Sequence, residues 1–204
     1  LEFCRMLIEA YPGSERIVNS IGILPFHISL TIGSFAVAKY LLRLYPESIN
    51  VATPDVGNDI RGGHPIHYAV GGLTKRANSA TAPRMVQLLL DHDPNVALQK
   101  IHGRLPLLMT FCNACNNRKN ASILNAAMRM LQLLYDAHPE VIEDDRMTRH
   151  SSVIPEEIQT FINTQLTYAR LARNSTARQM KKRDVNGQVP LHRALCHIVA
   201  LGSI

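Results

Sequence analysis

The feature that most constrains the fold of this chain is a six-residue motif that occurs four times. Each copy has glycine at its first position and proline at its fourth, and the copies occupy residues 22–27, 62–67, 103–108 and 187–192. The prolines lie 40, 41 and 84 residues apart, and the last interval is close to two periods. A recurrent period of this length predicts a stack of small structural repeats, an architecture that binds partners and has no reaction built into it.

Each motif is followed by an apolar segment with the spacing of a helix. Proline suits the first position of a helix, because the N–H at that position has no acceptor within the helix. The glycine three residues earlier is expected to adopt a positive φ in a tight turn. We therefore expect the first helix of each unit to begin at Pro25, Pro65, Pro106 or Pro190.

A second recurrent proline marks the end of a second amphipathic helix. The four prolines, each with the apolar pair that lies four and five residues before it, are Pro12 (Leu7 and Ile8), Pro46 (Leu41 and Leu42), Pro94 (Leu89 and Leu90) and Pro139 (Leu134 and Tyr135). Another apolar pair lies four residues earlier in each case, so that both pairs share one helix face. Each unit is thus predicted to contain two helices, and the fold class is all-α.

The motif resembles the Thr-Pro-Leu-His-x-Ala segment of the ankyrin repeat. It reads Leu-Pro-Phe-His-x-Ser at 24–29, His-Pro-Ile-His-x-Ala at 64–69, Leu-Pro-Leu-Leu-x-Thr at 105–110 and Val-Pro-Leu-His-x-Ala at 189–194. The longer period is similar to that of the divergent ankyrin arrays of diatoms and related algae. The resemblance implies an ankyrin-type solenoid of stacked helix-loop-helix repeats, here with one inserted long helix.

The resemblance also implies which residues build the turns and which bind a partner. Structural roles, including backbone hydrogen bonds from the histidines, are implied for Gly22, Pro25, His27, Gly62, Pro65, His67, Gly103, Pro106, Gly187, Pro190 and His192. In the family, extended loops and first helices form a concave surface that binds another protein. The residues expected to contact the partner are Asn58, Asp59, Arg61, Lys100, His102, Arg104, Asp184, Asn186 and Gln188.

The repeat pattern divides the chain into one array with an interruption. We expect a single array over 1–204, with units at about 1–21 (partial), 22–61, 62–102, 103–142 and 184–204 (partial), and a helical insertion at 143–183. Helical spacing predicts one long helix from about Pro155 to Ala172 or beyond. Spacing alone leaves open whether this helix replaces a helix pair or lies beside the stack. Both ends of the chain are expected to continue in a longer protein.

Composition excludes some classes of protein and favours others. The net charge of +6 is mildly basic, and the sequence has no signal peptide and no apolar run that could span a bilayer. The four scattered cysteines indicate reduced thiols in an intracellular protein, either cytoplasmic or nuclear. Cys112 and Cys115 are interpreted as core residues near a helix end, because no second ligand pair follows them. No cofactor and no metal site are predicted.

Three functional hypotheses remain open at this level. The favoured one is a non-catalytic protein-protein interaction scaffold, since no nucleophile elbow, phosphate loop or zinc-protease motif is present. A second is a spacer or targeting region of a larger enzyme or signalling protein. The third is a binder of an acidic ligand or nucleic acid through a run of cations at 170–183, although nucleic acid is disfavoured because aromatic residues are not interleaved there.

Overall fold

The described residues of this computed structural model are 1–54, 62–74, 79–143 and 154–174, without the side chains of 143 and 169–174. In these ranges the chain is helical, with turns between helices and no strand beyond one isolated bridge. This confirms the all-α class for the described part of the chain. The chain divides into two compact units, Leu1–Ile162 and Asn163–Ile204.

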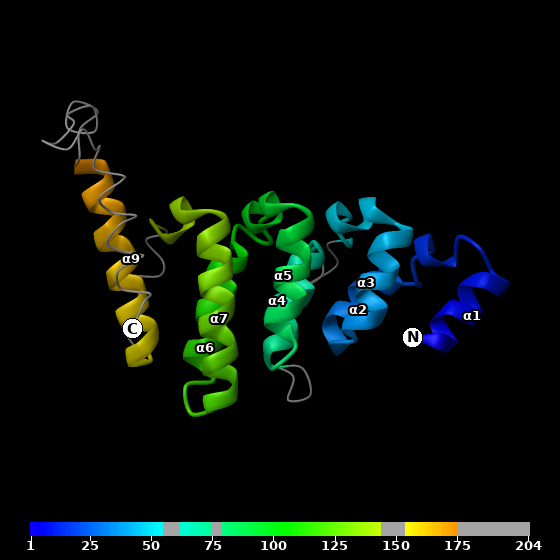
Figure 1. Cartoon of the computed structure of the whole chain (residues 1–204), viewed down its shortest axis with the longest axis horizontal. Coiled ribbons are helices and arrows are strands. Elements are labelled where there is room, and N and C mark those ends of the chain that lie inside the picture. Colours follow the sequence, from blue (N-terminus) through cyan, green and yellow to red (C-terminus); the bar gives the residue numbers. More distant parts are fainter. Residues whose placement is uncertain (55–61, 75–78, 144–153, 175–204) are drawn as a thin grey trace, which may run out of the picture. The chain divides into compact units, whose positions relative to one another are not determined.

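Short and medium helices alternate along the first unit (Figure 1). The α-helices are α1 (Glu2–Ala10), α2 (Pro25–Ile32), α3 (Phe35–Leu44), α4 (Pro65–Gly71), α5 (Ala82–His92), α6 (Pro106–Asn116), α7 (Ala121–Ala137) and α9 (Glu156–Asn174), and the 3₁₀ helices are η1 (Ser14–Arg16), η2 (Pro46–Asn50), η3 (Gly72–Thr74), η4 (Pro94–Leu98) and η5 (Pro139–Glu143). α2, α4 and α6 begin at the motif prolines, as the sequence predicts.

The prolines after the second helices have two effects. α3, α5 and α7 each end two residues before a proline, and the residue between them has an extended φ of −137° to −149°. Proline disfavours helical conformation in the residue that precedes it, which explains these ends. Pro46, Pro94 and Pro139 then start the 3₁₀ helices η2, η4 and η5, because a missing N–H costs nothing at a first helical position.

The helices of the first unit form pairs, and each pair packs against the next one. α2 packs on α3, α4 on α5 and α6 on α7, while α2 also contacts α4, α4 contacts α6, α3 contacts α5 and α5 contacts α7. The predicted apolar face of the second helices lies inside these contacts, where Leu41, Leu42, Leu89 and Leu134 are buried. The core of the unit is therefore made mainly of helix faces, to which the turns add Leu24 and Ile101.

α1 corresponds by sequence to a second helix, but it buries none of its side chains. Phe3 and Leu7, which belong to its predicted apolar face, are 71% and 45% exposed. α1 thus has the apolar spacing of α3, α5 and α7, but its apolar side chains are not buried as theirs are.

The long helix predicted near residue 155 is α9. Its first turn carries Glu156 and Glu157, which complement the positive end of the helix dipole. Within the first unit Ile158, Phe161 and Ile162 are buried, and the Phe161 ring meets Tyr135 edge-on at 6.0 Å between centroids. The second unit is described only for residues 163–174, which continue this helix.

Candidate binding surface of the turns and first helices

Three glycines give the motif turns their shape. Gly22, Gly62 and Gly103 have φ of 76°, 81° and 71°, which confirms the predicted positive φ. Gly22 has a second constraint, because a Cβ atom at this position would lie 2.4 Å from Cδ and Cγ of Pro54. The turn before α2 therefore approaches the loop that follows η2 more closely than any side chain would allow.

His27 fixes the first turn from within. Its Nδ1 accepts the N–H of Leu24 at 3.3 Å, so the ring hydrogen resides on Nε2 and is donated to the carbonyl oxygen of Val51 at 2.9 Å. The side chain is fully buried, and burial lowers its pKa from 6.5 to about 4. The imidazole is thus neutral and connects the start of α2 to the loop after η2.

His67 has the same role in the next repeat. Its Nδ1 accepts the N–H of His64 at 3.0 Å, and its Nε2 donates to the carbonyl oxygen of Gln99 at 3.2 Å. Burial, together with the neighbouring His64, lowers its pKa from 6.5 to about 4. A further bond joins successive turns, because the Gln99 side-chain amide donates to Asn50 Oδ1 at 2.8 Å. These bonds hold neighbouring turns in a fixed register.

The third motif has Leu108 in place of the histidine, and the turn before it is held by backbone hydrogen bonds. Ile101 and Arg104 exchange two backbone hydrogen bonds, of 3.0 Å from Ile101 N–H and 2.8 Å from Arg104 N–H. Between them His102 and Gly103 both have positive φ, of 47° and 71°, which is the pattern of a two-residue hairpin turn. This hairpin presents Lys100, His102 and Arg104 as exposed side chains.

The structure thus brings together one of the three predicted groups of partner-binding residues. Lys100, His102 and Arg104 share the exposed third turn. The other predicted residues, namely Asn58, Asp59, Arg61, Asp184, Asn186 and Gln188, lie outside the described residues, as do Gly187, Pro190 and His192 of the fourth motif.

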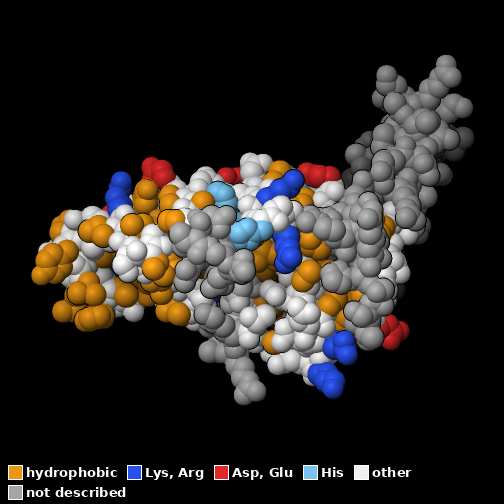
Figure 2. Space-filling view, turned by 180° about the vertical axis from the view of Figure 1, so that it is seen from behind, with side chains coloured by type: hydrophobic (Ala, Val, Ile, Leu, Met, Phe, Trp, Pro, Cys, Tyr) orange, Lys and Arg blue, Asp and Glu red, His pale blue; other side chains and the backbone are white. Residues whose placement is uncertain are grey.

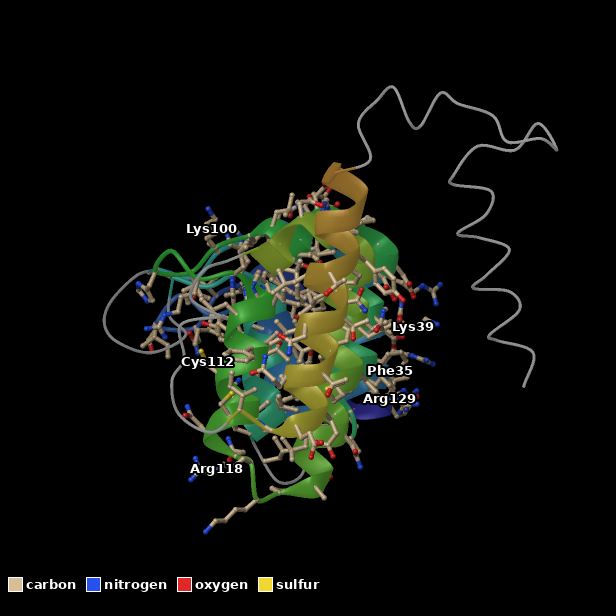
Figure 3. The ribbon with its side chains drawn as sticks, turned by 90° about the vertical axis from the view of Figure 1, so that its left-hand side faces the viewer. Phe35, Lys39, Lys100, Cys112, Arg118 and Arg129 are labelled. Carbon is tan, nitrogen blue, oxygen red and sulfur yellow. The ribbon has the colours of Figure 1, made fainter. Side chains whose placement is uncertain are left out.

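Two further exposed cations follow α6 and were missed by the sequence analysis. Arg118 and Lys119 are exposed in the short connection between α6 and α7. In Figure 3 Lys100, Cys112 and Arg118 lie on one side of the first unit, whereas Phe35, Lys39 and Arg129 lie on the opposite side. The repeat motif gave no signal for Arg118 or Lys119, because they stand at the far end of the first helix.

No described Asp or Glu side chain belongs to a motif turn or to a first helix. Every described Asp or Glu side chain belongs to a second helix, to η1, η2, η4 or η5 and their caps, to α1 or to the start of α9. Figure 2 shows histidine side chains beside Lys or Arg side chains on the face behind Figure 1, with apolar side chains toward the N-terminal end. The described parts of the turns and first helices therefore carry cations and neutral groups but no carboxylate.

Cys112 and Cys115 of α6 are half-buried, so they are less enclosed than the predicted core positions. Burial and the neighbouring Cys112 raise the pKa of the Cys115 thiol. No group of three or more His, Cys, Asp or Glu side chains that could hold a metal ion occurs in residues 1–54, 62–74, 79–143 and 154–174. The cations at 170–183 lie outside the described side chains.

No model of a known protein family matches this chain, and no curated protein matches it. Among the helices that the structure describes, none has both the length and the apolar content that a membrane crossing requires.

Proposed function

We propose that this chain is an ankyrin-type repeat array, a non-catalytic scaffold that binds another protein through its motif turns and first helices. The observation that carries the proposal is the shared geometry of the turns before α2, α4 and α6. In all three, a glycine with positive φ precedes a proline at the first helical position. Two of them are also held by a buried histidine. This agrees with what the sequence resemblance implies.

The division between buried and exposed residues supports a binding role for this side. The apolar side chains of the second helices pack neighbouring pairs together, whereas Lys100, His102 and Arg104 are exposed on a turn that two backbone hydrogen bonds close. Side chains on a loop that a stable framework holds in place are well suited to recognition, because little conformational entropy is lost when they bind.

A pull-down with matched variants tests the proposal. The full chain is immobilised and exposed to a nuclease-treated extract of its source cell, alongside a Lys100→Ala/Arg104→Ala variant and a Lys39→Ala/Arg129→Ala control on the opposite side (Figure 3). We expect a partner protein to be retained by the parent chain and the control but lost from the first variant. Equal retention by all three baits, with unchanged melting temperatures, would contradict the proposal.

A further inference from the structure

Four exposed cations flank the two ends of α6. Lys100 and Arg104 belong to the turn before this helix, and Arg118 and Lys119 to the connection after it. Within the described residues none of the four forms a salt bridge; the ion pairs there are made by other side chains. No described carboxylate therefore lies within salt-bridge distance of these four cations.

Acidic residues are far from this region in the sequence as well. The segment from 94 to 135, which contains η4, α6 and most of α7, has no Asp or Glu. The two acids just before it have partners of their own: Asp91 Oδ1 accepts from the Gln87 amide at 2.6 Å, and Asp93 Oδ1 accepts from the Asn95 backbone N–H at 2.9 Å. The repeat unit that contains α6 (103–142) has Arg104, Arg118, Lys119 and Arg129 against Asp136 and Glu140, so its net charge is positive.

The stretch between the two cation pairs is uncharged. Met109, Cys112, Asn113 and Asn116 follow the i, i+3, i+4, i+7 spacing of one helix face and are half-buried or exposed, while Leu107, Phe111 and Ala114 point into the core. α6 has 11 residues, so the cation pairs are separated by roughly 16 Å along the helix axis. An extended peptide covers that distance in about five residues.

We infer that the partner bound by this surface presents an acidic protein segment along α6, with one Asp/Glu cluster on Lys100 and Arg104 and a second on Arg118 and Lys119. The inference rests on the proposed function and specifies the chemistry of its partner. The uncharged face of α6 receives the neutral residues between the two clusters. Charge complementarity of this kind selects partners and fixes the register in which they bind.

A nucleic acid fits the same surface less well. A nucleic-acid backbone carries charge along its whole length, so its binding site would be expected to have a continuous row of cations. Here the cations form two pairs, and the residues of α6 between them are uncharged. Binding of single strands also relies on aromatic side chains on which bases stack. α6 exposes none, because its one aromatic residue, Phe111, is fully buried.

Fluorescence anisotropy with the full chain and designed peptides tests this inference. The probe is a labelled peptide with two Glu pairs separated by about five uncharged residues, which matches the length of α6. The comparison peptide has the same composition with all four Glu adjacent, and a labelled oligothymidylate provides the nucleic-acid comparison. We expect the spaced peptide to bind at least several-fold more tightly than the other two ligands.

Charge-reversal variants then locate the binding surface. Arg104→Glu/Arg118→Glu should weaken the spaced peptide by about tenfold or more, because each change replaces attraction by repulsion. Lys39→Glu/Arg129→Glu, which changes net charge equally on the opposite side, should leave its affinity within about twofold. Circular dichroism melts of both variants verify that the fold is intact.

Several outcomes would overturn the inference. Equal affinity for the spaced and clustered peptides, equal weakening by both pairs of reversals, or tighter binding of the oligothymidylate would each do so. If no peptide binds but the pull-down partner still depends on Lys100 and Arg104, the acidic-segment inference fails and the proposed scaffold stands. If the pull-down shows no such dependence, the proposed function itself fails.

Discussion

His67 donates its Nε2–H to the carbonyl oxygen of Gln99 at 3.2 Å, and thereby joins the start of α4 to a residue 32 positions later. His27 makes the equivalent bond to Val51 across 24 positions. In both cases the other ring nitrogen accepts the backbone N–H three residues earlier. A protonated ring would bring a second hydrogen against that N–H, so the bonds hold only the neutral form.

Stability is expected to fall as the pH is lowered from 6.5 to about 4. Because burial lowers the pKa of both histidines from 6.5 to about 4, the unfolded chain binds more protons than the folded chain in this window. The stabilisation is complete above pH 6.5 and is lost progressively down to pH 4. A shift of this size corresponds to roughly 3 kcal/mol for each histidine. Urea unfolding at several pH values measures how the free energy of unfolding changes with pH.

The control for this prediction removes the titrating groups. A His27→Gln/His67→Gln variant is less stable at pH 7, but its free energy of unfolding should depend less on pH between 6.5 and 4. His92→Gln, at an exposed position at the end of α5, provides a matched substitution for comparison. If the free energy of unfolding varied with pH equally in the parent chain and the double variant, His27 and His67 would not be the cause of the pH dependence.

Substitution by alanine at two motif glycines should lower the free energy of unfolding by unequal amounts. Gly103→Ala places a Cβ in open space at φ 71°, so we expect only the strain of the left-handed region, about 1 kcal/mol. Gly22→Ala adds a clash, because its Cβ would lie 2.4 Å from Pro54. It should therefore cost clearly more than Gly103→Ala in chemical unfolding. Equal costs would mean that the approach of Pro54 to the first turn is relaxed in solution.

The sequence predicted the local structure of the described units well, because their backbone is set by short-range chemistry. Proline at the first helical position, glycine with positive φ and paired leucines at helical spacing each act within a few residues, and the structure has all three where they were expected. In the third motif Leu108 cannot make the hydrogen bonds of His27 and His67. The turn before it is a two-residue hairpin at His102 and Gly103, which the motif did not predict in this detail.

The candidate site was predicted only in part, because it depends on packing between distant segments. Lys100, His102 and Arg104 were expected at the binding surface from their place before a motif glycine, and they are exposed there. Arg118, which lies on the same side (Figure 3), follows the end of α6 and so stands outside the repeated motif from which the binding residues were predicted. The exposure of α1 could not be predicted from the sequence either, because its apolar residues have the same spacing as those of helices that pack against neighbours on both sides.

Arg84 of α5 and Phe35 of α3 are expected to stabilise the contact between their helices. The guanidinium carbon lies 4.3 Å from the centre of the Phe35 ring, a cation–π geometry on the partly exposed side of the second helices. A double-mutant cycle with Phe35→Leu and Arg84→Gln should give a coupling free energy of about 0.5–1 kcal/mol. The same cycle between Phe35 and Arg129, which belongs to α7, serves as the control and should give no coupling.

Leu89→Ala should destabilise the chain through the cavity that it leaves between neighbouring helix pairs. Leu89 of α5 is 0% exposed, in the face that packs on α3 and α7, so we expect a loss of about 2–5 kcal/mol in urea unfolding. Leu98, at the end of η4, is 39% exposed, and Leu98→Ala removes the same atoms at a cost of less than about 1 kcal/mol. An equal effect of the two substitutions would show that the face of α5 assigned to the core is not the one that holds adjacent pairs together.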